Sequence, residues 1–308
     1  MRVRHLAVTS ILFGISMVGG CGGSASAPAV EVPRVDRPPQ SGLVWMRDEA
    51  GHDRTWWVAL DGSPLAGQPI DGPLWADGEA LWQMTIEDVP IGLYDEEPDE
   101  EGAPPDSERV GEVHRVVLRD LVDDARMVAV EAPTPGVVHE VEHEIRLEGS
   151  VGPYLFFVER LSVTAFGAHG AEEMRAVVWD LSAAAPADVA TDRELARWEP
   201  EATRRARALP EVEEDASVSF VAFHPRWSPE GLAVELQVSA ETCYACGDGE
   251  WSDYTRSARI ALPEPPERLA IPLPAWAREA ATRDGGTLMG FTRVESAAPA
   301  GILDSLSR

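Results

Sequence analysis

Short runs of alternating or continuous apolar residues recur along most of the chain and predict a body made mainly of β-strands. Val, Trp, Phe and Leu dominate these runs, and Asp-Gly, Pro-Gly and Gly-Pro turns separate them. The expected strands cover residues 43–46, 55–60, 80–86, 113–118, 154–158, 176–179, 217–223 and 232–238. The pattern therefore predicts a mainly β (α+β) fold built from antiparallel sheets.

Two segments have helical periodicity instead. Over residues 192–209, apolar side chains recur at spacings of three and four, and Asp192 can cap the first turn. The apolar positions are Leu195, Trp198, Ala202 and Ala206. A second short helix is expected over residues 274–282. The sheets are thus expected to carry one or two short helices.

Three apolar strands end in an aspartate turn at nearly constant intervals. The aspartates are Asp61, Asp120 and Asp180, which lie 59 and 60 residues apart. The dipeptide Trp179-Asp180 and the segment 225–231 resemble blade motifs of β-propellers, the latter those of periplasmic propellers related to the TolB family. Because the intervals exceed the ~40–50 residues of an ordinary blade and a helix would interrupt one, a β-propeller is the alternative fold.

The first twenty residues resemble the signal of a bacterial lipoprotein. A basic start, an apolar run over residues 6–18 and two glycines precede Cys21. The resemblance implies that residues 1–20 are removed and that acyl chains on Cys21 anchor the protein in a membrane. Gly22 stands where an aspartate usually causes inner-membrane retention, which favours the outer membrane. The orientation, periplasmic or cell-surface, stays open, and an ordinary secretory signal or an uncleaved anchor are the alternatives.

Composition divides the remaining chain into a tether and a folded part. Residues 21–41 begin with the lipidated cysteine and are rich in Ser, Ala, Pro and Val, so they are expected to be a disordered tether. Residues 42–308 are expected to form a single β-rich ectodomain. Within it, residues 95–108 are acidic and proline-rich, which predicts a solvated loop, with a weak calcium site as the alternative.

The chain is strongly acidic, and this narrows its partners. It has 53 acidic against 26 basic residues, a formal charge of −27, and every basic residue is arginine. Such a charge excludes a nucleic-acid partner and opposes adsorption to anionic lipid. Membrane attachment must therefore come from the lipid on Cys21, and the expected partners are an envelope protein or a glycan.

A second resemblance covers roughly residues 110–265. Its features are the turn Gly167-Ala168-His169-Gly170, the strand end Trp179-Asp180-Leu181, a helix, and strands around Phe220 and Val234. In this order they resemble the extracytoplasmic Gly-Ala-His domain shared by some anti-sigma factors and envelope polysaccharide deacetylases. The resemblance implies an α+β sandwich that binds an envelope ligand or presents a protein surface, with a structural role for His169. Phe166 departs from the doubled glycine of that family, and no catalytic deacetylase domain accompanies it.

Residues 139–143 match the zinc-peptidase pattern H-E-x-x-H. On a helix, His139 and His143 would share one face and bind a single zinc ion, with Glu140 as the general base. The segment also alternates well as a strand from residue 137, and a strand would place the two histidine Cα atoms ~13 Å apart. We favour the strand, with half-buried histidines and no cofactor, and keep the zinc peptidase as the alternative function.

Two residues separate Cys243 from Cys246, which gives the spacing C-x-x-C. In an oxidising envelope compartment they are expected to form a disulfide. A redox-active pair and a zinc site are the alternatives, although neighbouring acids and the lack of a second C-x-x-C disfavour both.

The chain has ten tryptophans, and aromatic clefts stack against sugars. Trp56 and Trp57 are adjacent, so on a strand they point to opposite faces, which makes them the candidates for a ligand surface. No nucleophile, phosphate-loop or dinucleotide motif is present in a suitable context. The sequence thus favours an outer-membrane lipoprotein whose ectodomain binds an envelope ligand or protein partner without catalysis.

Overall fold

The computed structural model describes residues 40–95, 109–164, 171–210, 212, 216–241 and 255–308. They belong to one compact unit, Arg37–Arg308. None of the described helices is both long and apolar enough to cross a membrane.

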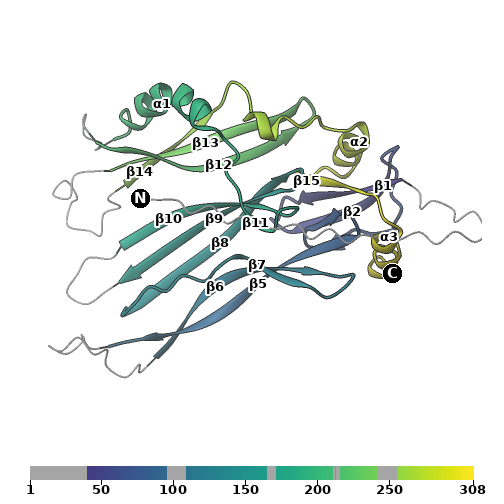
Figure 1. Cartoon of the computed structure of the whole chain (residues 1–308), viewed down its shortest axis with the longest axis horizontal. Helices are drawn as coiled ribbons and strands as arrows, with labels where there is room; N and C mark the ends of the chain where they lie inside the picture. Colours follow the sequence, from purple (N-terminus) through teal and green to yellow (C-terminus); the bar gives the residue numbers. More distant parts are fainter. Residues whose placement is uncertain (1–39, 96–108, 165–170, 211, 213–215, 242–254) are drawn as a thin grey trace, which may run out of the picture. The chain divides into compact units, whose positions relative to one another are not determined.

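The described strands form four antiparallel sheets (Figure 1). Neighbouring strands of a sheet are consecutive in the chain, except that the last described strand pairs with the first. Sheet 1 contains β15 (Thr287–Val294), β1 (Ser41–Arg47), β2 (Asp53–Ala59) and β3 (Ile70–Asp71). Sheet 2 contains β4 (Leu74–Asp77), β5 (Ala80–Leu93), β6 (Arg109–Asp120) and β7 (Arg126–Val130). Sheet 3 contains β8 (Glu140–Val151), β9 (Tyr154–Thr164), β10 (Ala171–Asp180) and β11 (Ala185–Pro186). Sheet 4 contains β12 (Val218–Ser228), β13 (Gly231–Glu241) and β14 (Thr255–Ala261).

The first strands of the four sheets, β15, β4, β8 and β12, meet around Ser150 of β8. The indole Nε1 of Trp75 in β4 donates to Ser150 Oγ at 3.2 Å, and the Nε1 of Trp227 in β12 donates to Ser150 O at 2.9 Å. Gly290 of β15 packs so closely that a Cβ atom there would lie 1.8 Å from Ser150 Oγ. Four consecutive sheets whose first strands converge in this way form a propeller-like arrangement.

The prediction of a mainly β fold with antiparallel sheets is confirmed, in the propeller-like form that the sequence offered as the alternative. Helix α1 (Asp192–Ala206) lies between β11 and β12, so it connects two sheets and does not interrupt one. The repeat is longer than an ordinary blade because the strands of sheets 2 and 3 are long, up to 14 residues in β5. Four sheets also replace the two-layer sandwich that the family resemblance implies.

The three regularly spaced aspartates occupy equivalent turns. Asp61, Asp120 and Asp180 each follow or end the third strand of sheets 1, 2 and 3. Each carboxylate accepts a hydrogen bond at 2.9 Å from the backbone N–H two residues later, as in an Asx turn. The ring closes because β15, near the end of the chain, pairs with β1, near its start. The interval in the sequence therefore marks a true structural repeat.

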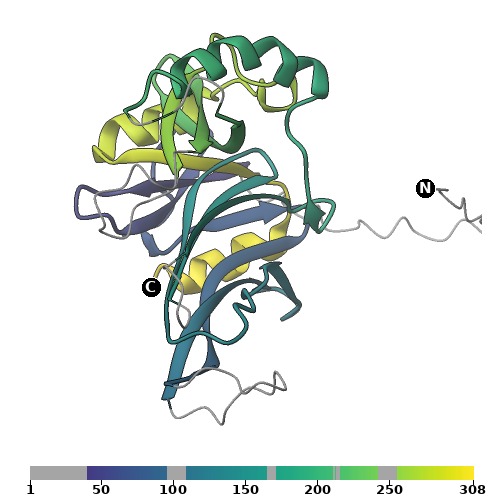
Figure 2. The same cartoon turned by 90° about the vertical axis from the view of Figure 1, so that its left-hand side faces the viewer.

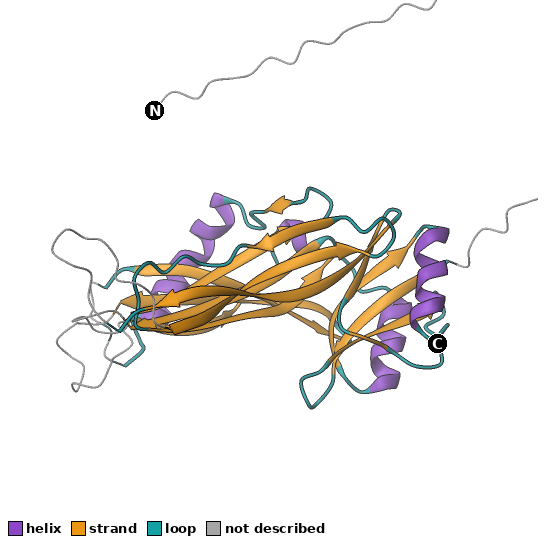
Figure 3. Cartoon of the chain, turned by 90° about the horizontal axis from the view of Figure 1, so that it is seen from below, coloured by secondary structure: helices purple, strands orange, loops and turns teal. Residues whose placement is uncertain are grey.

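The helices lie toward the periphery of the strands (Figures 2 and 3). Helix α1 starts at the N-cap Thr191, one residue before the expected cap, in a capping box with Glu194. Its Trp198 and Ala202 pack on sheet 4, and Figure 1 shows α1 beside β12, β13 and β14. The other described helices are the 3-10 helix η2 (Glu267–Leu269), α2 (Ala275–Asp284) and α3 (Ala297–Leu306). The sequence predicts α1 and α2 but not α3.

Candidate functional site

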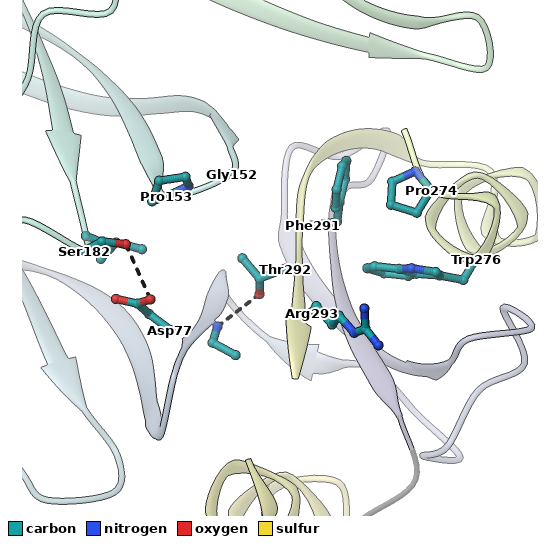
Figure 4. Close-up of a pocket in the computed structure, with 11 residues that line it drawn as sticks. Asp77, Gly152, Pro153, Ser182, Pro274, Trp276, Phe291, Thr292 and Arg293 are labelled. Carbon is teal, nitrogen blue, oxygen red and sulfur yellow. Dashed lines mark hydrogen bonds between the residues drawn. The ribbon is translucent and has the colours of Figure 1, made fainter. Parts of the chain in front are cut away.

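A pocket of about 430 Å³ opens where the inner strands β4, β8 and β15 end (Figure 4). Its walls come from β4, the β8–β9 and β10–β11 turns, the start of α2, and β15. The lining residues are Ala76, Asp77, Gly152, Pro153, Leu181, Ser182, Pro274, Trp276, Phe291, Thr292 and Arg293. We call this cavity the axial pocket, because it lies beside the strands on which the four sheets converge.

One wall of the axial pocket is aromatic. The rings of Trp276 and Phe291 meet edge to face, with centroids 5.7 Å apart and an interplanar angle of 86°. The Trp276 ring lies over Gly42 of β1, where a Cβ atom would be 2.5 Å from the ring. Trp276 and Phe291 are only 9% and 8% exposed, so the wall is firmly packed and offers little open ring surface.

The opposite wall is polar. Ser182 Oγ donates to Asp77 Oδ1 at 3.4 Å, which links the β10–β11 turn to the end of β4. Between the two walls, Thr292 Oγ1 accepts a hydrogen bond from the Ala76 N–H at 3.0 Å, so the hydroxyl proton of Thr292 is left to donate (Figure 4). The pocket thus combines acceptors and donors with a fixed apolar side.

Two opposite charges in this pocket lack an ionic partner. Asp77 and Arg293 form no salt bridge with each other or with any other described residue. Most described arginines, in contrast, pair with a carboxylate, as Arg47 does with Asp53 at 2.8 Å. Asp77 is therefore available to a ligand, whereas the Arg293 side chain extends away from Asp77, beside Trp276 (Figure 4).

The tryptophans proposed from the sequence lie elsewhere. Trp57 is buried, and its Nε1 donates to Ser41 Oγ at 3.0 Å. Trp56 is half-buried, with the Arg283 guanidinium 5.7 Å from its ring centroid. Neither residue lines the axial pocket; the tryptophan that does is Trp276.

The H-E-x-x-H segment is a strand, as the alternation predicts. Glu140 begins β8 and is exposed, whereas His143 is buried and accepts the His114 backbone N–H at its Nδ1, 2.8 Å away. Its Nε2 therefore carries the proton and donates to Glu159 Oε1 at 3.0 Å. The half-buried His139 precedes the strand and contacts the carbonyl oxygen of Tyr94 at 3.0 Å.

The zinc-peptidase alternative needs both imidazoles on one helical face, whereas the segment from Glu140 onward is a strand. Both histidines are separately engaged, and no three potential metal ligands gather anywhere in the described ranges. His143 is also more deeply buried than the half-buried state expected for it. Burial lowers the pKa of His143, and the hydrogen bond to Glu159 only partly opposes this effect. The neutral imidazole thus serves as a structural link between β6, β8 and β9.

A second buried polar group joins sheets 3 and 4. His224 of β12 lies 2.9 Å from Glu148 Oε2 through Nδ1 and 2.8 Å from Gln237 Oε1 through Nε2. Burial by itself raises the pKa of Glu148, but the hydrogen bond to His224 and the charge of Arg146 outweigh it and lower the pKa to about 2. Glu148 is therefore ionised in the folded protein, and its role is to hold the inner strands together.

Several candidates from the sequence lie outside the described residues. They are the lipidation site Cys21, the cysteines Cys243 and Cys246, the turn of residues 167–170, and nearly all of the acidic run 95–108. Their expected roles stay predictions.

The sequence analysis missed the residues that build the axial pocket. Asp77 stands in an Asp-Gly pair and signals only a turn, while Arg293 lies in an apolar strand that was not predicted. Trp276 falls within the expected second helix but carries no signal of a site. These residues are separated by up to 216 positions in the chain, so only the closed ring of sheets brings them together.

No protein-family model matches the chain, and neither the curated proteins nor the solved structures give a significant match.

Proposed function

We propose that this protein is a lipid-anchored outer-membrane protein whose ectodomain binds a small envelope ligand in the axial pocket and does not transform it. The observation that carries the proposal is the pocket itself, a cavity of about 430 Å³ with one apolar wall, one polar wall and two unpaired charges. Cavities of this size with a few convergent polar groups are typical of small-ligand sites.

The chemistry of the lining favours binding over catalysis. Ser182 and Thr292 are the hydroxyl groups among the lining residues, and the lining includes no histidine, cysteine or lysine to activate them. The buried histidines His143 and His224 are engaged in links between strands. The groups that line the pocket can therefore orient a ligand through hydrogen bonds and charge.

The anchor is proposed from the sequence. The segment that ends at Cys21 resembles a lipoprotein signal, and the net charge of −27 leaves an attached lipid as the means of holding the protein at an anionic membrane. Acyl chains on one residue would keep the pocket within reach of ligands near the membrane.

Binding in the axial pocket is tested by filling it. Ser182 is exposed and lines the pocket, so Ser182→Trp should fill the cavity while the fold is retained; Ala183→Trp, next to it in the same turn and not in the lining, is the control. We would titrate the full chain with monosaccharides, amino acids and dipeptides by isothermal calorimetry. At least one probe should bind, and Ser182→Trp alone should abolish that binding. If no probe binds at millimolar concentration, or if both variants bind equally, the proposal fails.

The anchor is tested by mass spectrometry of the chain expressed in a Gram-negative host. The protein should start at residue 21 and carry a diacylglycerol thioether and an acylated amino terminus. Cys21→Ala should remove both and release the protein from the membrane fraction. Unlipidated wild-type protein that starts elsewhere would overturn this part of the proposal.

A further inference from the structure

We infer that sheets 2 and 3 are joined by a pH-sensitive switch, in which protonation of His143 releases the outer half of the β5–β6 pair from β8. The outer half comprises residues 88–93 of β5 and 109–114 of β6. None of the residues that form the switch lines the axial pocket, so the switch goes beyond the proposed function and does not depend on it.

Histidines are concentrated at this contact. The chain has seven histidines, and three of them, His114, His139 and His143, lie between the β5–β6 pair and the start of β8, where Figure 1 shows β6 beside β8. Histidine is the side chain whose charge ordinarily changes between about pH 5 and pH 8. A decrease in pH from neutral to mildly acidic therefore alters the charge at this contact.

Only the neutral imidazole of His143 makes both of its hydrogen bonds. Its Nδ1 accepts the backbone N–H of His114, 2.8 Å away, and its Nε2 donates to Glu159 Oε1 at 3.0 Å. A protonated imidazole carries a proton on both nitrogens, so the Nδ1 proton would point at the N–H proton of His114. The side chain of His143 is fully buried, which keeps bulk water away from that proton. Protonation therefore replaces the hydrogen bond between β6 and β8 with a contact between two donors.

The charged groups around His143 do not compensate for this loss. The rings of His114 and His143 stack, with centroids 5.5 Å apart and an interplanar angle of 20°, so protonation of both places two positive charges face to face. Each nearby carboxylate already has another partner, because Asp88 pairs with His114 and Glu159 pairs with Arg175. The neighbours of His143 along β8 point to the opposite face of the sheet. Burial lowers the pKa of His143, the bond to Glu159 raises it only in part, and the charges of His114 and Arg175 lower it further.

The inner half of the β5–β6 pair, residues 80–87 and 115–120, is held to sheet 3 by apolar packing. Val116 and Leu118 of β6 lie in one buried cluster with Ile145 and Leu147 of β8. These contacts do not titrate, so they remain when His143 is protonated.

The outer half relies more on polar contacts. Beyond the histidines, the Tyr94 N–H donates to Val138 O at 3.0 Å. The buried apolar side chains in the described outer half are Val113 and Leu93, and neither belongs to the apolar cluster of the inner half. Loss of the hydrogen bond between β6 and β8 therefore opens the outer half locally and leaves the inner half closed.

Amide hydrogen exchange of the full chain, followed by mass spectrometry at about pH 7.5 and pH 5.5, tests the switch. After correction for intrinsic exchange rates, the protection of the outer half should decrease about tenfold at the lower pH. One histidine that has an ordinary pKa of ~6.5 when the contact is open changes the opening equilibrium by about this factor. The protection of the inner half should be the same at both pH values.

Two variants assign the effect to His143. His143→Asn removes the titrating group and keeps a carbonyl oxygen that can accept the His114 N–H at any pH, so the protection of the outer half should no longer depend on pH. The readout is a ratio between two pH values, so it stays valid even if the substitution lowers protection at both. His52→Gln, which changes an exposed histidine between β1 and β2, is the matched control and should keep the wild-type ratio.

Three results would overturn the inference. The first is equal protection of the wild-type outer half at both pH values. The second is a wild-type ratio that persists in His143→Asn, which would assign the effect to another histidine. The third is an equal loss of protection in the inner half, which would show that the whole β5–β6 pair unfolds. None of these results bears on ligand binding in the axial pocket, which the titration of Ser182→Trp decides separately.

Discussion

Gly290 of β15 is the position where the convergence of the four sheets is most sensitive to a single added atom. A Cβ atom there would lie 1.8 Å from Ser150 Oγ, 3.1 Å from Ser150 Cβ and 3.3 Å from Ser150 O. Ser150 is fully buried, and its Oγ accepts the Trp75 indole N–H. Gly290→Ala therefore forces Ser150 to move and disturbs the hydrogen bond that joins β4 to β8.

The expected loss follows from these two effects. Overpacking a well-packed core costs about 1–3 kcal/mol, and leaving a buried donor such as Trp75 Nε1 without a partner costs a further ~1–3 kcal/mol. We expect Gly290→Ala to lower the free energy of unfolding by about 3 kcal/mol. For a domain of this size, that corresponds to a decrease of about 6–12 °C in the Tm.

Equilibrium urea unfolding, followed by tryptophan fluorescence and near-UV circular dichroism, measures this loss. Gly301→Ala is the control, because a Cβ atom there contacts nothing and alanine should stabilise helix α3 by about 0.5–1 kcal/mol. Ser150→Ala removes the clashing oxygen, so the double variant should lose at least ~1 kcal/mol less than the sum of the single changes. A Gly290→Ala protein within 0.5 kcal/mol (roughly the effect of an ordinary surface substitution) of wild type would refute the reasoning.

Three other changes test the network around this centre. The pKa of Glu148 is about 2 in the folded protein, below its usual 4.5, so its ionised form stabilises the fold above pH 4.5 and this contribution is lost as the pH falls from 4.5 toward 2. Urea unfolding at several pH values should show a decrease of about 2 kcal/mol in the free energy of unfolding of the wild type that is absent in Glu148→Gln. An equal dependence of the free energy of unfolding on pH in both proteins would contradict this. Burial lowers the pKa of His143, so as the pH falls the unfolded chain takes up a proton before the folded protein does, and wild type should lose stability below pH ~6.5. His143→Gln should therefore give a flatter dependence of Tm on pH between about 7.5 and 5.5. The same dependence of Tm on pH in both proteins would argue against this role of His143. Gly42→Ala places a Cβ atom 2.5 Å from the Trp276 ring, so it should destabilise the fold by about 1–3 kcal/mol and weaken ligand binding in the axial pocket. Thermal unfolding measures the first effect and calorimetric titration the second. A Tm and an affinity equal to those of the wild type would show that Trp276 moves freely.

Local patterns in the sequence were sufficient for most elements of the fold. Alternation from residue 137 correctly predicted a strand for the H-E-x-x-H segment, because the side chains of a strand alternate between its two faces whatever the neighbouring sheets are. The spacing of Asp61, Asp120 and Asp180 reflected equivalent turns, since each carboxylate binds a backbone N–H only two residues away.

Tertiary structure alone decided how the sheets are arranged and where the pocket lies. Strand β15 is not distinguished by its own residues; its position follows from pairing with β1 at the other end of the ectodomain, which closes the ring. That closure brings Arg293 into the same cavity as Asp77, and α2 adds Trp276. The sequence by itself determined the strands, the turns and the charge of the chain, because these depend on neighbouring residues. The axial pocket depends on contacts between distant segments, which only the packing of the four sheets creates.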